Sequence, residues 1–126
     1  MRNEDKAIWE RFIQKNPGYF DEVEFDVHVG SKPDFDTNVV PGSQSDVGNI
    51  YQRKIDVVGY SAGNIYIVEL KPLAGSSALG QVKSYEILYR RDFKPEAKTI
   101  CVVITDFIGT DMEELADSMG VLLIEA

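Results

Sequence analysis

Residues 99–105, with the sequence TICVVIT, are apolar almost throughout. A strand without polar alternation is typical of a sheet that is covered on both faces. A helical pattern precedes it over residues 78–91. The main apolar positions of that helix are Leu79, Val82, Tyr85, Leu88 and Tyr89. A helix that leads into a strand buried on both faces favours an α/β fold, in which helices pack against a central sheet.

The hydrophobic pattern of the remaining sequence predicts further helices and strands. The expected elements are a helix over residues 4–15, strands over 22–29, 51–60 and 65–71, the helix over 78–91, the strand over 99–105, a helix over 111–119 and a strand over 121–124. The order is therefore α-β-β-β-α-β-α-β. Because a hairpin comes first and crossovers come later, we expect a mixed central sheet flanked by helices.

The segments on either side of residue 30 differ sharply in pattern. Apolar and polar side chains alternate over residues 22–29, which predicts a half-buried strand with its apolar side chains on one face. Those side chains are Val23, Phe25, Val27 and Val29. Residues 30–49 are rich in Gly, Pro and Ser and predict a loop of roughly twenty residues, a length that is usually functional.

The length and composition indicate one globular domain. A chain of 126 residues favours a single domain over residues 1–126, and 44% hydrophobic with 27% charged residues is a folded-protein mixture. No apolar run approaches the ~20 residues of a membrane-spanning helix. The mixed-charge N-terminus lacks the apolar stretch of a signal peptide. We therefore expect no membrane contact and a cytoplasmic location.

The chain has one cysteine, Cys101, and one histidine, His28. It can form no internal disulfide, which agrees with a reducing compartment. One Cys and one His cannot build a structural zinc site, and a histidine-activated nucleophile would depend on His28 alone. We expect Cys101 to be a small core residue and His28 to face solvent.

The charge is unevenly distributed. The net charge is −8, which argues against a protein that wraps nucleic acid. Residues 53–98, however, hold eight basic and five acidic residues and carry +3, so the two flanks together carry −11. A basic centre between acidic flanks is compatible with a local phosphate-binding face, and equally with a solvated surface.

The predicted hairpin brings ionisable side chains together. If its turn is centred between Ala62 and Gly63, Asp56 lies directly opposite Glu69, on the same face. Lys71 is two residues beyond Glu69 and points the same way. Two opposed carboxylates need a compensating cation, which Lys71 supplies in part and a divalent metal would supply further. Oxygen ligands favour Mg²⁺ or Mn²⁺ over zinc or copper.

Two further residues bear on this hairpin. Pro72 has no N–H to donate to a ladder and is expected to end the second strand. The alternative interpretation is an exposed salt-bridge ladder with Lys54 opposite Lys71, which would contribute little. Against it, the second strand carries Ile65 and Ile67 on the same face, which is the pattern of a buried stripe.

These residues resemble the core motif of the PD-(D/E)XK nucleases, the restriction-endonuclease-like superfamily. Asp56, twelve intervening residues and Glu69-Leu70-Lys71 match its D…E-x-K pattern. Gln81 and Tyr85 match the Q-x-x-x-Y pattern that accompanies the motif in RecB-like and Holliday-resolvase-like members. The predicted elements over about residues 4–107 match the αβββαβ core of the family. Ile55 stands where the proline of the family name would be.

The resemblance implies roles for the matched residues. Asp56 and Glu69 would bind Mg²⁺ or Mn²⁺ together with the backbone carbonyl of Leu70. Lys71 would orient or help deprotonate the attacking water. The pair Gln81 and Tyr85, one helical turn apart, would face the active site, and the alternative for the pair is a helix-to-sheet packing contact.

Many members of the family add an acid from the first helix. Glu4, Asp5 and Glu10 are the acids available here. Glu4 and Asp5 lie near the apolar stripe of the helix whereas Glu10 points away, and the sequence does not choose between the first two.

The resemblance also implies the function. We expect a metal-dependent nuclease that hydrolyses nucleic acid, DNA rather than RNA. The alternative is a non-catalytic nucleic-acid-binding or assembly module on the same fold. A chain of this size has little surface beyond a catalytic core, so a homodimer or a protein partner is expected to help engage a duplex. By analogy, such a domain would suit a phage or mobile element.

Overall fold

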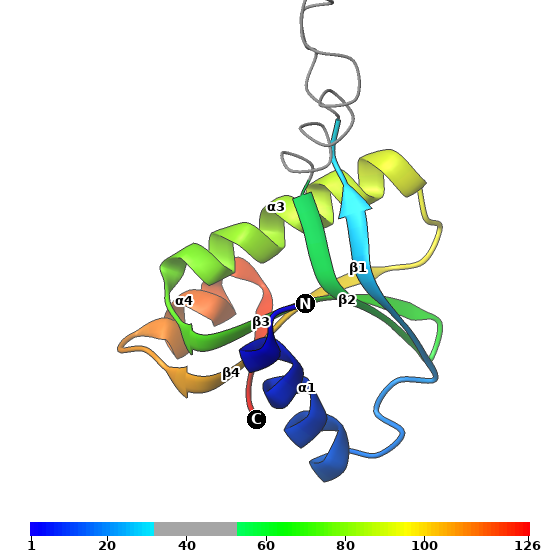
Figure 1. Ribbon diagram of the computed structural model, residues 1–126. Helices are drawn as coiled ribbons and strands as arrows, with labels where there is room; N and C mark the ends of the chain where they lie inside the picture. Colours follow the sequence, from blue (N-terminus) through cyan, green and yellow to red (C-terminus); the bar gives the residue numbers. More distant parts are fainter. Residues whose placement is uncertain (32–52) are drawn as a thin grey trace, which may run out of the picture.

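A five-stranded mixed sheet forms the centre of the protein in the computed structural model, which describes residues 1–31 and 53–126 (Figure 1). The elements are α1 (Asn3–Lys15), β1 (Glu22–Val29), β2 (Arg53–Ser61), β3 (Asn64–Ala74), α3 (Ser76–Phe93), β4 (Thr99–Ile108), α4 (Met112–Met119) and β5 (Val121–Glu125). The strands lie in the order β1-β2-β3-β4-β5. β1, β2 and β3 pair antiparallel, and β3, β4 and β5 pair parallel. The predicted α/β fold with a mixed, helix-flanked sheet is confirmed, and most of the predicted loop lies outside the described residues.

Helices cover both faces of the sheet. Figure 1 shows α1 on one side and α3 on the other. Ile8 and Phe12 of α1 pack on a buried cluster that includes Val102 of β4, whereas α3 covers a second cluster that includes Cys101. Successive side chains of β4 therefore point into two different cores, one on each face of the sheet, as its uninterrupted apolar sequence predicts. None of the described helices is long and apolar enough to cross a membrane.

The hairpin between β2 and β3 has the predicted register. Ala62 and Gly63 both have positive φ angles, 51° and 79°, which is the geometry of a type I′ turn. Ser61 therefore pairs with Asn64, and the ladder continues from there to Val57 and Val68. Beyond that pair, no further β2–β3 partners are formed in the described residues.

Pro72 does not end β3, which continues to Ala74. Lys71 and Leu73, on either side of the proline, pair with β4. Among the described residues, β2 has no partner on β3 beyond Val68, so Pro72 lies where the β2 edge of β3 is unpaired. A residue without an N–H is tolerated there because no ladder bond is required. The prediction was wrong because the sequence does not show where the two strands part.

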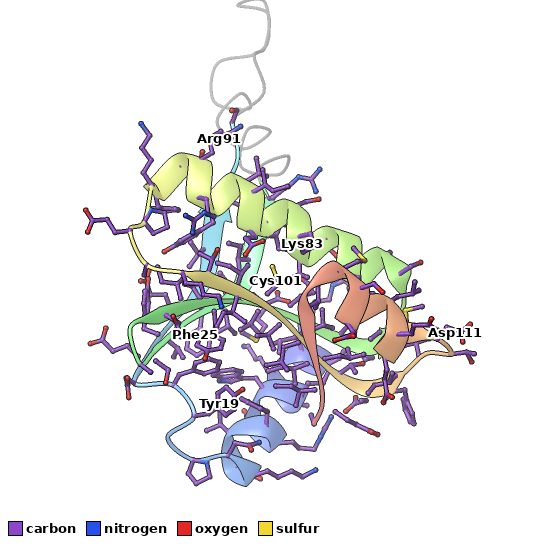
Figure 2. All side chains as sticks on the ribbon, turned by 180° about the vertical axis from the view of Figure 1, so that it is seen from behind. Tyr19, Phe25, Lys83, Arg91, Cys101 and Asp111 are labelled. Carbon is purple, nitrogen blue, oxygen red and sulfur yellow. The ribbon has the colours of Figure 1, made fainter. Side chains whose placement is uncertain are left out.

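The four apolar side chains of β1 do not share one face, contrary to the prediction. Val23 packs in the cluster under α1, while Val27 packs in the cluster under α3 and Val29 is part of it. Phe25 makes an edge-to-face contact with Trp9 of α1, and Figure 2 shows it on the same side of the sheet as Tyr19. Asp26, between Phe25 and Val27, has a φ of 53°. This conformation interrupts the pleat of β1, so the side chains after Asp26 point to the opposite face from the one that regular alternation predicts. Aspartate is among the few residues other than glycine that adopt this conformation readily.

An aromatic cluster closes the end of the sheet near the β2–β3 turn, and Gly59 is its tightest point. A Cβ added at Gly59 would lie 2.5 Å from the ring of Phe20, which stacks on Trp9 and contacts Tyr66 edge-on. We expect Gly59→Ala to lower the free energy of unfolding by about 1–3 kcal/mol, because the ring must move within a packed cluster. Urea denaturation followed by circular dichroism measures this change.

The control for that prediction is Gly80→Ala in α3. Apart from its chain neighbours and the nearby backbone of α3, no described atom lies within 4 Å of a Cβ added at Gly80. Replacing an exposed helical glycine by alanine should raise stability by about 0.5–1 kcal/mol. Equal effects at Gly59 and Gly80 would contradict the tight contact with Phe20.

Candidate active site

The site begins where β2 and β3 part. The carboxylate of Asp56 accepts a hydrogen bond from the backbone N–H of Leu70, at 2.9 Å, where the ladder would otherwise continue. A side chain thus takes the place of a backbone partner at the fork of the two strands. The N–H and C=O of one residue in an extended strand point to the same edge, so the carbonyl of Leu70 also faces this fork.

A cavity of about 690 Å³ lies at the fork, with α1 on one side and α3 on the other. Every residue selected from the sequence lines it: Asp56, Glu69, Leu70, Lys71, Gln81 and Tyr85. The register explains this convergence. Glu69 and Lys71 continue the β3 face that carries Ile65 and Ile67 under α3, and Asp56 is the next β2 residue beyond the last ladder pair.

Burial dominates the electrostatics of the two carboxyl groups. Glu69 is only 5% exposed, and burial, followed by repulsion from Asp56, raises its pKa to about 8, although the nearby Lys71 lowers it. Burial also raises the pKa of Asp56, and the hydrogen bond from Leu70 opposes that change. The Oε2 atom of Glu69 is buried and has no hydrogen-bond partner within residues 1–31 and 53–126. A buried carboxylate oxygen in this state is costly to the fold unless a cation or a proton satisfies it.

Asp5 is the first-helix acid that the fold buries beside this pair. It is 9% exposed and lines the cavity, whereas Glu4 lines the same cavity but is exposed. Burial raises the pKa of Asp5, while Arg2 and then Lys71 lower it among the nearby charges. Asp5 precedes Ile8 and Phe12 by three and seven positions, so it shares their inward stripe. The sequence did not choose between Glu4 and Asp5 as the first-helix acid, and the structure buries Asp5. Glu10, the third acid of the helix, is exposed.

Gln81 and Tyr85 reach the cavity from α3. The side-chain amide of Gln81 donates a hydrogen bond to the hydroxyl of Tyr85, as expected for residues one turn apart. Tyr85 is buried, and burial, followed by the charge of Glu69, raises its pKa. The pair belongs to the wall of the cavity as well as to the packing of α3 on the sheet.

Arg2, His28, Arg53 and Lys54 also line the cavity, although the sequence analysis assigned them no role in the site. His28 is exposed as expected, but it lies at the cavity and pairs with Lys54 across β1 and β2. Lys54 makes a loose ion pair with Asp26, at 3.9 Å. The available signal was the position of Arg53 and Lys54, three and two residues before Asp56 on one strand.

The donor set fits a hard divalent cation. It consists of the carboxylates of Asp56 and Glu69 and the backbone carbonyl of Leu70, which faces the fork. Within the described residues, Oε2 of Glu69 is the oxygen of this set that is buried without a hydrogen-bond partner. Mg²⁺ is commonly bound by only one or two carboxylates and keeps several waters. Among the described residues, no group of three or more His, Cys, Asp or Glu side chains is arranged to hold a metal, so Asp5 does not complete a cage of side chains.

Comparisons with known proteins place the fold. No family model matches the sequence. No curated protein matches it either. Three solved structures match over nearly the whole chain: the protein of unknown function AF1548 (TM-score 0.62, 16% identity, 97% of this chain and 57% of that one), a repair endonuclease from Pyrococcus abyssi (0.57, 16%, 100% and 48%) and EndoMS in complex with double-stranded DNA (0.56, 20%, 100% and 46%).

These similarities define the class of fold. At 16–20% identity, they show that the chain shares the architecture of structures that include repair endonucleases. The chain spans about half the length of each of these structures. Activity and partners must therefore be argued from the site.

Proposed function

We propose that this chain is a metal-dependent nuclease of the PD-(D/E)XK, restriction-endonuclease-like superfamily that hydrolyses phosphodiester bonds of DNA. The observation that carries the proposal is the buried, unpartnered Oε2 of Glu69 in a cavity shared with Asp56 and Lys71. A buried carboxylate oxygen without a partner is costly to the fold, and a bound divalent cation would satisfy it. The fold shared with repair endonucleases and with a DNA-bound structure supports the same conclusion.

In this proposal Asp56, Glu69 and the Leu70 carbonyl hold Mg²⁺ or Mn²⁺. Such an ion lowers the pKa of nearby water and offsets charge on the phosphoryl oxygens. Lys71 points to the face of Glu69, where its ammonium group orients the attacking water and stabilises the charge that develops on the phosphate. Gln81 and Tyr85 form the opposite wall and restrict how the phosphate enters. Asp5 adds a further acid that accepts a proton or a hydrogen bond from water.

A chain of 126 residues has little surface beyond the candidate site for contacts to a duplex. The chain corresponds to about half of each matched structure. We propose that a second copy of the chain, or a partner protein, supplies the remaining duplex contacts.

A non-catalytic module on the same fold is the second candidate, and the net charge of −8 favours it. A general binding module for nucleic acid normally carries a basic surface, and an assembly module does not require one. The two candidates differ in metal binding, because an assembly module has no need of an unsatisfied carboxylate.

Cleavage assays distinguish the two. Supercoiled plasmid, single-stranded DNA and RNA of matched sequence would be incubated with the chain in Mg²⁺, in Mn²⁺ and in EDTA. We expect DNA cleavage with either ion, weaker cleavage of RNA and none in EDTA. Absence of cleavage together with absence of Mn²⁺ binding by calorimetry would favour the module.

A further inference from the structure

The β1–β2 end of the cavity carries basic side chains that the chemistry above does not use. We propose that Arg53 and Lys54, with His28 beside them, form a subsite that binds the backbone phosphate next to the scissile one, so that the nucleic-acid strand enters the cavity past the start of β2. This inference rests on the proposed nuclease function. It adds a phosphate-binding subsite and the path by which the nucleic-acid strand enters the cavity.

Strand geometry places these cations beside the carboxylates. β2 begins at Arg53, and Asp56 follows Lys54 by two residues, a distance of about 7 Å along an extended strand. His28 pairs directly with Lys54 across the β1–β2 ladder. Lys54 and His28 share one face of the sheet, whereas Arg53, the neighbouring residue on β2, points to the other face. All three line the cavity because it opens to both faces at the fork. A phosphate held at this end of the cavity leaves the next phosphodiester within reach of Asp56.

The charge distribution makes the cavity the favoured place for a polyanion. Its lining includes four bases, Arg2, Arg53, Lys54 and Lys71, and four acids, Glu4, Asp5, Asp56 and Glu69. Their formal charges cancel, so the rest of the chain carries the whole net charge of −8. A nucleic acid is therefore repelled by most of the surface and meets its least repulsion at this cavity.

Two of the four bases are already engaged with acids. Lys71 is the cation that most lowers the pKa of Glu69, and Arg2 is the one that most lowers the pKa of Asp5. Arg53 and Lys54 are exposed, and in the described part of the chain the ion pair of Lys54 is a 3.9 Å contact with Asp26. Asp26 is itself bound by the N-terminal amino group at 3.2 Å. Long, exposed ion pairs are weak, so Lys54 can exchange Asp26 for a phosphate at little cost.

The test compares Arg53→Gln/Lys54→Gln with the unaltered chain. Fluorescence anisotropy would give the affinity for labelled single-stranded and duplex DNA in EDTA at several salt concentrations, and cleavage kinetics in Mg²⁺ would give kcat and KM. We expect affinity to fall at least about tenfold at low salt, and the slope of log K against log salt to shrink by about 2 for duplex DNA. KM should rise while kcat stays within about twofold, because the lost phosphate contact stabilises the bound substrate and the transition state equally.

The matched control is Lys94→Gln/Lys98→Gln, which removes the same charge outside the cavity. It should leave both affinity and salt slope nearly unchanged, and thermal melting verifies that both variants fold. If the two double variants weaken binding equally, or if Arg53→Gln/Lys54→Gln behaves like the unaltered chain, the subsite is overturned while the nuclease function stands. If the unaltered chain neither binds nor cleaves DNA, the proposed function fails and the subsite falls with it.

Discussion

Lys71→Ala is expected to reduce DNA cleavage by about 10²–10³-fold in kcat, because removing one preorganised group that stabilises developing charge has effects of this size. The side chain lies on the β3 face of Glu69, and its charge acts on both Glu69 and Asp5. The substitution removes the ammonium group and leaves the Asp56–Leu70 hydrogen bond in place. Single-turnover cleavage of a labelled DNA at saturating Mg²⁺ measures the loss.

Two further variants make this result specific. Lys98→Ala removes an exposed lysine outside the cavity and should cleave like the unaltered chain. Asp56→Ala should also be inactive, since it removes a proposed metal ligand. Cleavage that persists in Lys71→Ala and Asp56→Ala, with contaminating nucleases removed, would refute the assigned site.

Glu69→Gln is expected to stabilise the metal-free protein at pH 8, by up to about 4 kcal/mol, while removing cleavage. Burial raises the pKa of Glu69 from 4.5 to about 8. Below pH 4.5 the carboxyl is protonated in both the folded and the unfolded chain and costs nothing. As the pH rises from 4.5 to 8, the unfolded chain ionises first, so the free energy of unfolding falls over this window. A neutral glutamine does not titrate, and the difference between variant and parent isolates this effect.

Urea denaturation at pH 4 and pH 8 measures the difference, which should be near zero at pH 4. Glu86→Gln provides the opposite control. Burial tends to raise the pKa of Glu86, yet hydrogen bonds from Thr99 and Lys83 lower it overall, so removing that charge should destabilise the fold. Mn²⁺ should raise the melting temperature of the parent at pH 8 and leave that of Glu69→Gln unchanged. A Glu69→Gln variant that is less stable than the parent at pH 8 would contradict the buried, unsatisfied carboxylate.

Local sequence patterns predicted the fold well because strand pairing here is set by local chemistry. Ala62 and Gly63 determine a two-residue turn, which fixes the register from Val57–Val68 to Ser61–Asn64. The apolar run of β4 required helices on both faces, and α1 and α3 provide them. These features follow from residues that are close in sequence or that alternate regularly.

The errors arose where the backbone departs from regular geometry. The positive φ of Asp26 exchanges the faces of β1, and no alternation pattern reveals it. The parting of β2 from β3 explains both the extension of β3 through Pro72 and the hydrogen bond between Asp56 and Leu70. The fork also opens the cavity to residues from both sides of the sheet, such as Asp5 and Arg53, which a face-by-face analysis of one hairpin does not bring together.

Anomalous diffraction from crystals grown with Mn²⁺ tests the central claim most directly, namely that the carboxylates at the strand fork hold a divalent cation. We predict one strong Mn²⁺ peak within about 2.1 Å of oxygens from Asp56 and Glu69, with the Leu70 carbonyl completing the protein ligands. Mn²⁺ bound only at other acidic side chains, with Asp56 and Glu69 free of metal, would contradict the proposed site.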